Sequence, residues 1–256
     1  MSRVSRGEAA LLALLLVAAF ATYHAMRLPG LVGLINDDGL YALYAKALVT
    51  GQGYVSLQWP EHPPAIRYPI GWPAVLAAAM AGAADPAAWA ARCQWAAAAA
   101  GTLFVGVSYL YLRRHLEPGP ALAAAAAVAF GAKTVELGSH VLSDLPFGAL
   151  SLGALLVLES ALPGHASPDV PAPPGHASPD VPGPPGLRGR FPARLACAGL
   201  LCGLAFLTRY AAVALIAAAV ASLAIRRDFR GLLVFAAACG LIAAPWLAGP
   251  AAAGAA

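Results

Sequence analysis

Residues 195–225 read LACAGLLCGLAFLTRYAAVALIAAAVASLAI and contain a single charged residue, Arg209, near the middle. About 20 apolar residues are enough for a helix to cross a bilayer, so this run of 31 residues is too long for one span. One continuous helix would put Arg209 near the bilayer centre, where a charge costs at least about 3 kcal/mol. We therefore predict two shorter helices, 195–208 and 210–225, with a turn at Thr208-Arg209-Tyr210.

The composition of the whole chain also indicates a membrane protein. Of its 256 residues, 60% are hydrophobic and 11% are charged, and the mean hydropathy is +0.71. Soluble domains carry about 25% charged residues, which cover their surface. We predict an all-α polytopic membrane protein of about seven transmembrane helices, the other five lying at 9–26, 89–112, 118–132, 142–162 and 231–248. Residues 9–26 could also be a signal peptide cleaved after Ala19-Phe20-Ala21, but the later spans favour an uncleaved anchor.

The basic residues predict the orientation of these spans. With a cytoplasmic N-terminus, ten of the sixteen Lys and Arg residues fall inside, as the positive-inside rule requires. These ten are Arg3, Arg6, Arg113, Arg114, Arg188, Arg190, Arg194, Arg226, Arg227 and Arg230.

Two segments between the spans stand out. Residues 27–86 form a long, polar first outer loop, which we expect to carry interfacial helices. Residues 163–194 are a proline-rich linker, predicted to be disordered and cytoplasmic, in which GHASPDVPAPP is followed by GHASPDVPGPP. The four cysteines lie in apolar stretches without a metal-ligand spacing and indicate packing.

The unusual polar residues gather on the predicted outer face. Ionisable residues at the membrane edge of an apolar protein are costly and often mark a site. Each could also be an ordinary solvated loop residue, but the set as a whole favours a site. Its members are Asp37, Asp38, Glu61, His62, Arg67, Lys133, Glu136, His140, Asp144 and Arg209.

Asp37 and Asp38 stand before a predicted surface helix in which Leu40, Tyr44, Ala47 and Leu48 share one face. One aspartate would serve as an N-cap. A second carboxylate beside it suggests a general base for an incoming hydroxyl.

The aromatic side chains of residues 59–73, Trp59, Tyr68 and Trp72, could anchor the loop at the interface or stack on a sugar ring. Lys133 and Arg209 are expected to flank one outer cavity and to bind a lipid phosphate. For Lys133, snorkelling to lipid headgroups is the alternative.

The order of these features resembles the GT-C-type membrane glycosyltransferases that use polyprenyl-phosphate sugars. This group includes protein O-mannosyltransferases, the aminoarabinose transferase that acts on lipid A, and Rgt-type enzymes of the lipopolysaccharide core. The matching pieces are Asp37-Asp38, Tyr41…Gly51-x-Gly53-Tyr54, Tyr68-Pro69-x-Gly71-x-Pro73, Ser143-Asp144-Leu145-Pro146-Phe147, residues 203–210 and Pro245-Trp246.

The resemblance implies a GT-C-like bundle in a bacterial inner membrane, with the active site on the periplasmic face. The implied reaction is inverting transfer of a hexosyl or pentosyl group from a polyprenyl phosphate to a hydroxyl of a lipid, glycan or protein acceptor. The implied roles are as follows: Asp37 is the general base beside Asp38, Arg209 and Lys133 hold the donor phosphate, and Arg67, Tyr68, His140 and Asp144 line the substrate pocket. No cofactor is required by the pattern, a divalent cation stays open, and nucleic acid is not an expected partner.

Members of the family continue through further spans, so the resemblance also implies a chain truncated at its C-terminus. Two other classes remain open. A non-catalytic or degenerate subunit of such an enzyme would fit the short length. A transporter would place its ionisable residues near mid-bilayer along a path, whereas these residues collect at one face.

Overall fold

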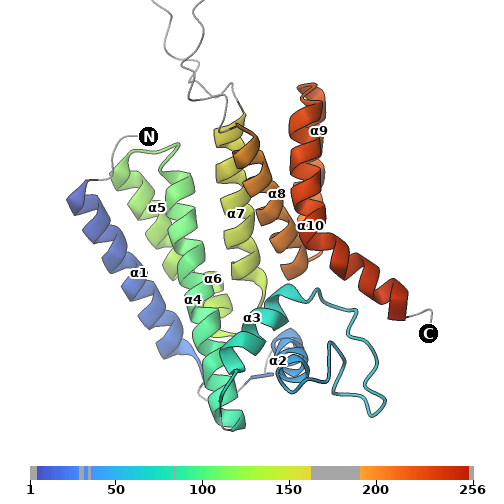
Figure 1. The fold of residues 1–256 in the computed structure, drawn as a ribbon. Coiled ribbons are helices and arrows are strands. Elements are labelled where there is room, and N and C mark those ends of the chain that lie inside the picture. Colours follow the sequence, from blue (N-terminus) through green and yellow to red (C-terminus); the bar gives the residue numbers. More distant parts are fainter. Residues whose placement is uncertain (1–4, 29–31, 34–35, 84, 163–190, 254–256) are drawn as a thin grey trace, which may run out of the picture.

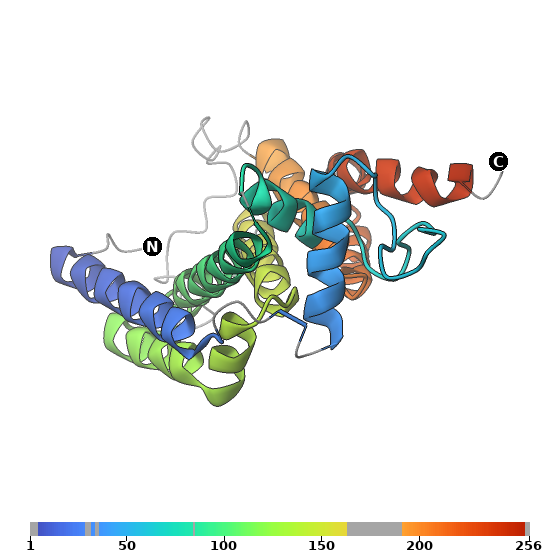
Figure 2. The same cartoon turned by 90° about the horizontal axis from the view of Figure 1, so that it is seen from below.

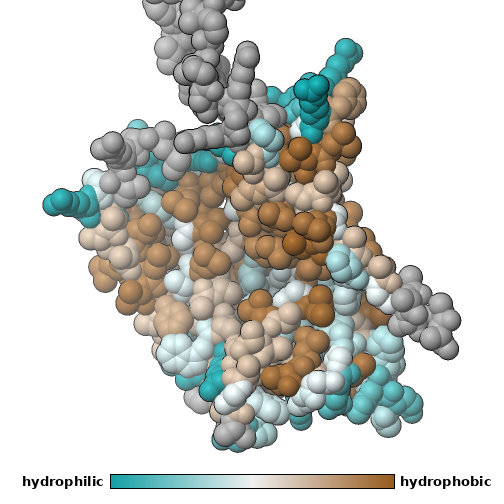
Figure 3. All heavy atoms as spheres, viewed as in Figure 1, coloured by the Kyte–Doolittle hydropathy of each residue, from teal (hydrophilic) through white to brown (hydrophobic). Residues whose placement is uncertain are grey.

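The computed structural model describes residues 5–28, 32–33, 36–83, 85–162 and 191–253, which form ten helices and no β-sheet. Of the linker predicted at 163–194, residues 163–190, with Arg188 and Arg190, lie outside the described part, whereas residues 191–194 are helical and begin α8 (Phe191–Thr208). Four of the described helices are long and apolar enough to cross a membrane: α1 (Arg6–Met26), α4 (Pro86–Leu112), α7 (Asp144–Ala161) and α10 (Phe229–Ala253, to Gly249). α1, α4 and α7 pack in this order, and α8 packs between α7 and α10 (Figure 1). Hydrophobic residues cover the middle of the face seen in Figure 3. The chain is therefore a helical membrane protein.

Two helices take the place of the expected span at 118–132. α5 (Pro118–Phe130) and α6 (Ala132–Ser139) meet at Gly131 with a bend of 57°, and together they would make a fifth span. α6 packs against α1 and α4, and a side chain at Gly138 would collide with the Tyr23 ring of α1 at 2.8 Å. The polar segment that follows α5 is thus folded back onto the bundle.

The long apolar run at 195–225 is broken where a turn was predicted. α8 (Phe191–Thr208) ends just before Arg209, and α9 (Ala212–Ile225) begins three residues after it. α9, and α8 when counted from Pro192, fall among the shorter apolar helices of 10–17 residues. Seven spans therefore remain a prediction, of which the structure supports four or five by length and composition.

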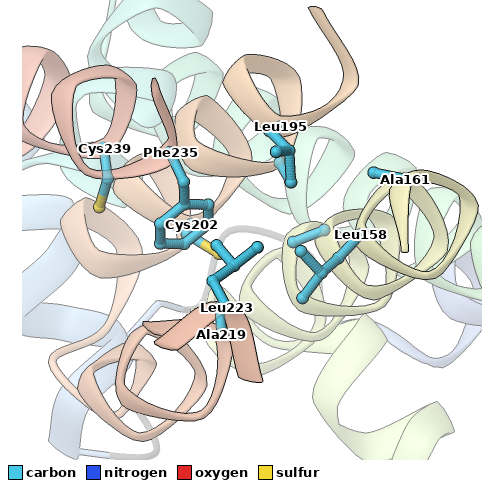
Figure 4. Packing of buried hydrophobic residues seen from close by; sticks show 10 residues of the cluster. Leu158, Ala161, Leu195, Cys202, Ala219, Leu223, Phe235 and Cys239 are labelled. Carbon is cyan, nitrogen blue, oxygen red and sulfur yellow. The ribbon is translucent and has the colours of Figure 1, made fainter. Parts of the chain in front are cut away.

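Close packing joins α8 to α10. Gly199 and Gly203 are four residues apart on α8, and a Cβ at Gly199 would lie 2.4 Å from the Phe235 carbonyl oxygen of α10. Small residues at this spacing let membrane helices approach closely. Beside this contact, Cys202, Leu223 and Phe235 pack into one apolar cluster (Figure 4). All four cysteines are free thiols, and the three buried ones include Cys202.

The bundle has two different ends. We call the one with the start of α1 and residues 113–117 and 226–228 the N-terminal end, and the other the α2 end (Figure 1). α2 (Asn36–Val49) is seen end-on in Figure 1 and lengthwise in Figure 2, so it lies across the spans. α3 (Gly71–Met80) packs against α2 and α4. Residues 131–143 and 209–211 reach the same end.

Most basic residues of the described chain lie at the N-terminal end. One of them, Arg113, donates from Nε to Glu8 Oε1 at 2.8 Å, and Tyr109 donates to the same oxygen. Glu8 also forms a capping box with Ser5, which fixes the start of α1. A second pair at this end joins Arg114 to Glu159 at 3.4 Å. These contacts tie α1, α4 and α7 together.

Candidate functional site

Asp37 lies in the first turn of α2, and its carboxylate is partly open to solvent. The Tyr68 hydroxyl donates to Asp37 Oδ1, and Arg67 Nη2 lies 3.8 Å from the same oxygen. The Asp37 side chain is 38% exposed. The Arg67 guanidinium carbon also stands 5.3 Å from the centre of the Tyr68 ring. A carboxylate oriented by a phenol and a guanidinium, yet still accessible, suits proton exchange with a bound molecule.

Asp38 has a different environment from its neighbour. It is 1% exposed, and its Oδ1 accepts a hydrogen bond of 2.7 Å from the backbone N–H of Gly39. Its carboxylate is therefore buried and hydrogen-bonded to the backbone within the first turn of α2. The two adjacent carboxylates divide into a structural one and an accessible one.

A second ion pair lies near Asp37. Asp144 opens α7, and its carboxylate pairs with Arg209 from the turn between α8 and α9. The two side chains are 39% and 35% exposed. Because the break after Thr208 takes Arg209 out of a helix, its guanidinium reaches the α2 end of the bundle and has a partner there.

Tyr41 connects the two pairs. Its hydroxyl lies 2.7 Å from Ser143 Oγ, and both residues are buried, at 2% and 0% exposure. Burial raises the pKa of Tyr41; the carboxylates of Asp37 and Asp144 add to this effect, whereas the Ser143 hydrogen bond and Arg209 oppose it. The Tyr41 phenol is thus a neutral hydrogen-bonding group that interacts electrostatically with both carboxylates.

Aromatic side chains hold the loop that carries Arg67 and Tyr68. The Tyr54 hydroxyl donates to the carbonyl oxygen of Tyr68 at 2.9 Å, and the Tyr210 hydroxyl donates to that of Ile66 at 3.1 Å. The Tyr41 and Tyr68 rings are 4.7 Å apart between centres. At the end of the loop, a Cβ on Gly71 would lie 2.5 Å from the Leu207 carbonyl oxygen of α8. The loop is thereby fixed to α2 and to the turn that contains Arg209.

Tyr41, Tyr54 and Ser143 were not predicted as site residues, although all three lie in segments that resemble the GT-C family. Tyr41 and Tyr44 stand three residues apart in α2, and this spacing was the available signal. The partner of Tyr41 is 102 residues away, so no local pattern could identify it.

Burial is also the largest cause that raises the pKa of Tyr68, and the hydrogen bond to Asp37 adds to it. The phenol therefore stays protonated well above neutral pH and continues to donate a hydrogen bond to the Asp37 carboxylate. An apolar cavity of about 260 Å³ borders this region, lined by residues that include Tyr54, Ile66 and Trp246.

Lys133 and His140 contact other groups. Lys133 lies on α6, is 71% exposed, and pairs with Glu136 three residues along the same helix at 3.0 Å. His140 follows α6, and its Nδ1 lies 2.8 Å from the Glu136 carbonyl oxygen. The structure thus brings together Asp37, Arg67, Tyr68, Asp144 and Arg209, while Lys133 and His140 have their described contacts within their own segment.

Within the described residues, no three His, Cys, Asp or Glu side chains converge as a metal site would require. Comparisons with protein-family models, curated proteins and solved structures found no match for this chain. The geometry therefore carries the functional argument. It offers two accessible carboxylates, Asp37 and Asp144, each paired with an accessible guanidinium group at the same end of a membrane bundle.

Proposed function

We propose that the protein is a membrane glycosyltransferase that moves a sugar from a polyprenyl phosphate to an acceptor hydroxyl. The observation that supports this most directly is the partly exposed Asp37 carboxylate, hydrogen-bonded by Tyr68, in the neighbourhood of the Asp144–Arg209 pair. A base and a cation that faces an anionic leaving group are the two parts that such a transfer needs. The proposal includes seven spans, a cytoplasmic N-terminus and an active site on the outer face.

In the proposed step, the acceptor oxygen attacks the anomeric carbon and its proton passes to Asp37. A new carbon–oxygen bond forms as the bond from the anomeric carbon to the phosphate oxygen breaks, and the configuration inverts. The phosphate leaves with the electron pair of the broken bond. Arg209 stabilises the charge that develops on it, while Asp144 orients the Arg209 guanidinium.

Arg67 is the second cation of the proposed site, because it contacts Asp37 directly. Lys133 is less suited to this role, since its described contact is with Glu136 of its own helix and not with a residue of the proposed site. The apolar cavity beside Tyr54 and Trp246 could take part of the isoprenoid chain. Such a chain places the reacting phosphate at the membrane edge, where α2 lies across the bundle (Figure 2).

The test is sugar transfer by Asp37→Asn in membranes supplied with polyprenyl-phosphate mannose, glucose or aminoarabinose. Loss of a general base lowers a rate by about 10²–10⁴-fold. Asp85→Asn is the matched control, because Asp85 is an exposed aspartate that caps α4 at the same end of the bundle. We expect the control to keep full transfer. Equal activity of the two variants would reject Asp37 as the base.

A non-catalytic membrane subunit is the competing function. It predicts no transfer by the wild-type chain from any of the three donors. It also predicts that Arg209→Gln leaves the binding of polyprenyl phosphate unchanged.

A further inference from the structure

A second cavity lies against the face of α2 that does not carry Asp37 and Tyr41. It has a volume of about 430 Å³ and opens between α2, α3 and the beginning of α4. On α2 its wall includes Ala42, Leu43 and Lys46, which recur at helical spacing and share one face. Met80 and Trp89 close it from α3 and α4. The volume falls in the range of about 300–1,000 Å³ that is typical of ligand pockets.

Lys46 gives this apolar cavity one positive charge. Its ammonium stands over the Trp89 ring, 5.5 Å from the ring centre. Within the described part of the chain, no carboxylate lies at ion-pair distance from it. Lys133 differs in this respect, since Glu136 neutralises it at 3.0 Å. A cation at an apolar pocket without an acidic partner is complementary to an amphiphile with an anionic head.

We propose that this cavity binds one anionic phospholipid, with its phosphate at Lys46 and an acyl chain between α2, α3 and α4. The surrounding bilayer supplies such molecules at high local concentration. Apart from Lys46, the side chains of the walls are apolar and can contact an acyl chain. The headgroup of a lipid lies at the membrane edge, as α2 does at the end of the bundle. The bound lipid would fill the cavity beside Ala42, Leu43 and Lys46, whereas the Asp37 carboxylate belongs to the proposed active site.

The inference does not depend on the proposed function. Asp37, Tyr41 and Tyr68 do not line this cavity, whose α2 wall is formed by Gly39, Ala42, Leu43 and Lys46. A protein without transferase activity could still bind the lipid, and a transferase could work without it.

The experiment is native mass spectrometry of the purified full chain, titrated in detergent with phosphatidylglycerol. We expect one retained lipid on the wild type. Ala42→Phe and Ala90→Phe fill the cavity from opposite walls, so each should abolish retention, and a melting curve identifies the variant that folds. Lys46→Gln should weaken retention about tenfold, since it removes one charged hydrogen bond. Lys133→Gln makes the same charge change elsewhere and should leave retention intact.

Two further probes separate the sources of binding. Phosphatidylcholine, which has the same chains without net charge, should be retained less, and inorganic phosphate should not displace phosphatidylglycerol. Equal retention by all variants would overturn the proposal, as would equal weakening in Lys46→Gln and Lys133→Gln. Displacement by inorganic phosphate would also overturn it, because the acyl chain in the cavity would then add nothing to the affinity.

Discussion

The two ends of the bundle use the same kinds of side chain in opposite ways. At the N-terminal end, Arg113 and Glu8 form a pair in which the side chains are 15% and 5% exposed. At the α2 end, Arg67 and Asp37 are 60% and 38% exposed, and Arg209 and Asp144 are 35% and 39% exposed. A closed pair can only hold helices together, whereas an open pair can exchange its partner for a ligand.

The difference follows from how each pair is built. Glu8 accepts from Arg113 and Tyr109 and also closes a capping box, so its acceptor positions serve the fold. Asp37 accepts a hydrogen bond from a loop residue, Tyr68. The Tyr68 ring packs against Tyr41 of α2, and its carbonyl oxygen accepts a hydrogen bond from Tyr54. This arrangement orients the carboxylate and leaves part of it accessible. The pairs of the proposed site therefore combine exposure with contacts between separate segments of the chain, whereas the exposed Lys133–Glu136 pair lies within one helix.

The largest expected effect separates the ends by stability. Glu8→Gln removes the negative charge that neutralises the largely buried Arg113 guanidinium, so the free energy of unfolding should decrease. We expect the melting temperature in detergent, followed by circular dichroism, to fall by at least about 5 °C. Asp37→Asn should change it by less than about 2 °C, because exposed pairs contribute little.

Glu159→Gln provides an intermediate case. Its partner Arg114 lies 3.4 Å away, and the two side chains are 25% and 21% exposed. Its melting temperature should lie between those of the other two variants. If Asp37→Asn unfolded as readily as Glu8→Gln, the distinction between a structural and a functional end would be lost.

The next effect concerns phosphate binding at the α2 end. Arg209→Gln should weaken the binding of polyprenyl phosphate about 10–100-fold, as expected for a lost charge-assisted hydrogen bond. The measurement is a titration of the purified protein with the lipid. Arg92→Gln is the control, because Arg92 donates to the Ala81 carbonyl oxygen near the same end and does not contact the site residues described above. Equal weakening by both would indicate a non-specific charge effect.

A smaller effect tests the connection between the two open pairs. Tyr41→Phe keeps the ring and removes the hydroxyl that lies 2.7 Å from Ser143 Oγ. A buried hydrogen bond of this kind contributes about 0.5–1.5 kcal/mol, so transfer should fall about 2–10-fold if the bond positions Asp37.

A double-mutant cycle makes this test specific. Ser143→Ala and Tyr41→Phe should cost similar amounts, because each leaves the other hydroxyl buried without this partner. The double variant should then cost less than the sum of the single ones. Strict additivity would mean that the two hydroxyl groups do not act together.

The sequence was sufficient to predict the long apolar helices, but it did not predict α3 or α6 as separate helices or how residues of different helices meet. Apolar runs and the charge at Arg209 predicted a membrane protein and the break that follows Thr208, because hydrocarbon imposes strong local rules. The partner of Arg209 is Asp144, on another helix, and that contact depends on how α7 and α8 pack. For the same reason, the sequence could not distinguish the open carboxylate of Asp37 from the buried one of Asp38.

Lys133 is a predicted site residue whose contacts in the structure lie away from the proposed site. Its charge and its place after an apolar run suggested a cation that faces the same cavity as Arg209. The 57° bend between α5 and α6 sets it on a short helix packed against α1 and α4, with Glu136 one turn away. The bend depends on tertiary contacts such as that between Gly138 and Tyr23, which no local pattern reveals.

The smallest predicted effect is on the titration of Tyr68. A neighbouring carboxylate disfavours the phenolate, so Asp37→Asn should lower the pKa of Tyr68, by roughly one pH unit. The pKa should stay above its ordinary value, because burial is the larger cause of the increase. Ultraviolet difference titration at alkaline pH, with Tyr68→Phe to identify the signal, measures this change. Glu61→Gln removes an exposed carboxylate from the same loop and should leave the titration unchanged. An unchanged pKa in Asp37→Asn would mean that the phenol and carboxylate do not form the contact on which the open pair depends.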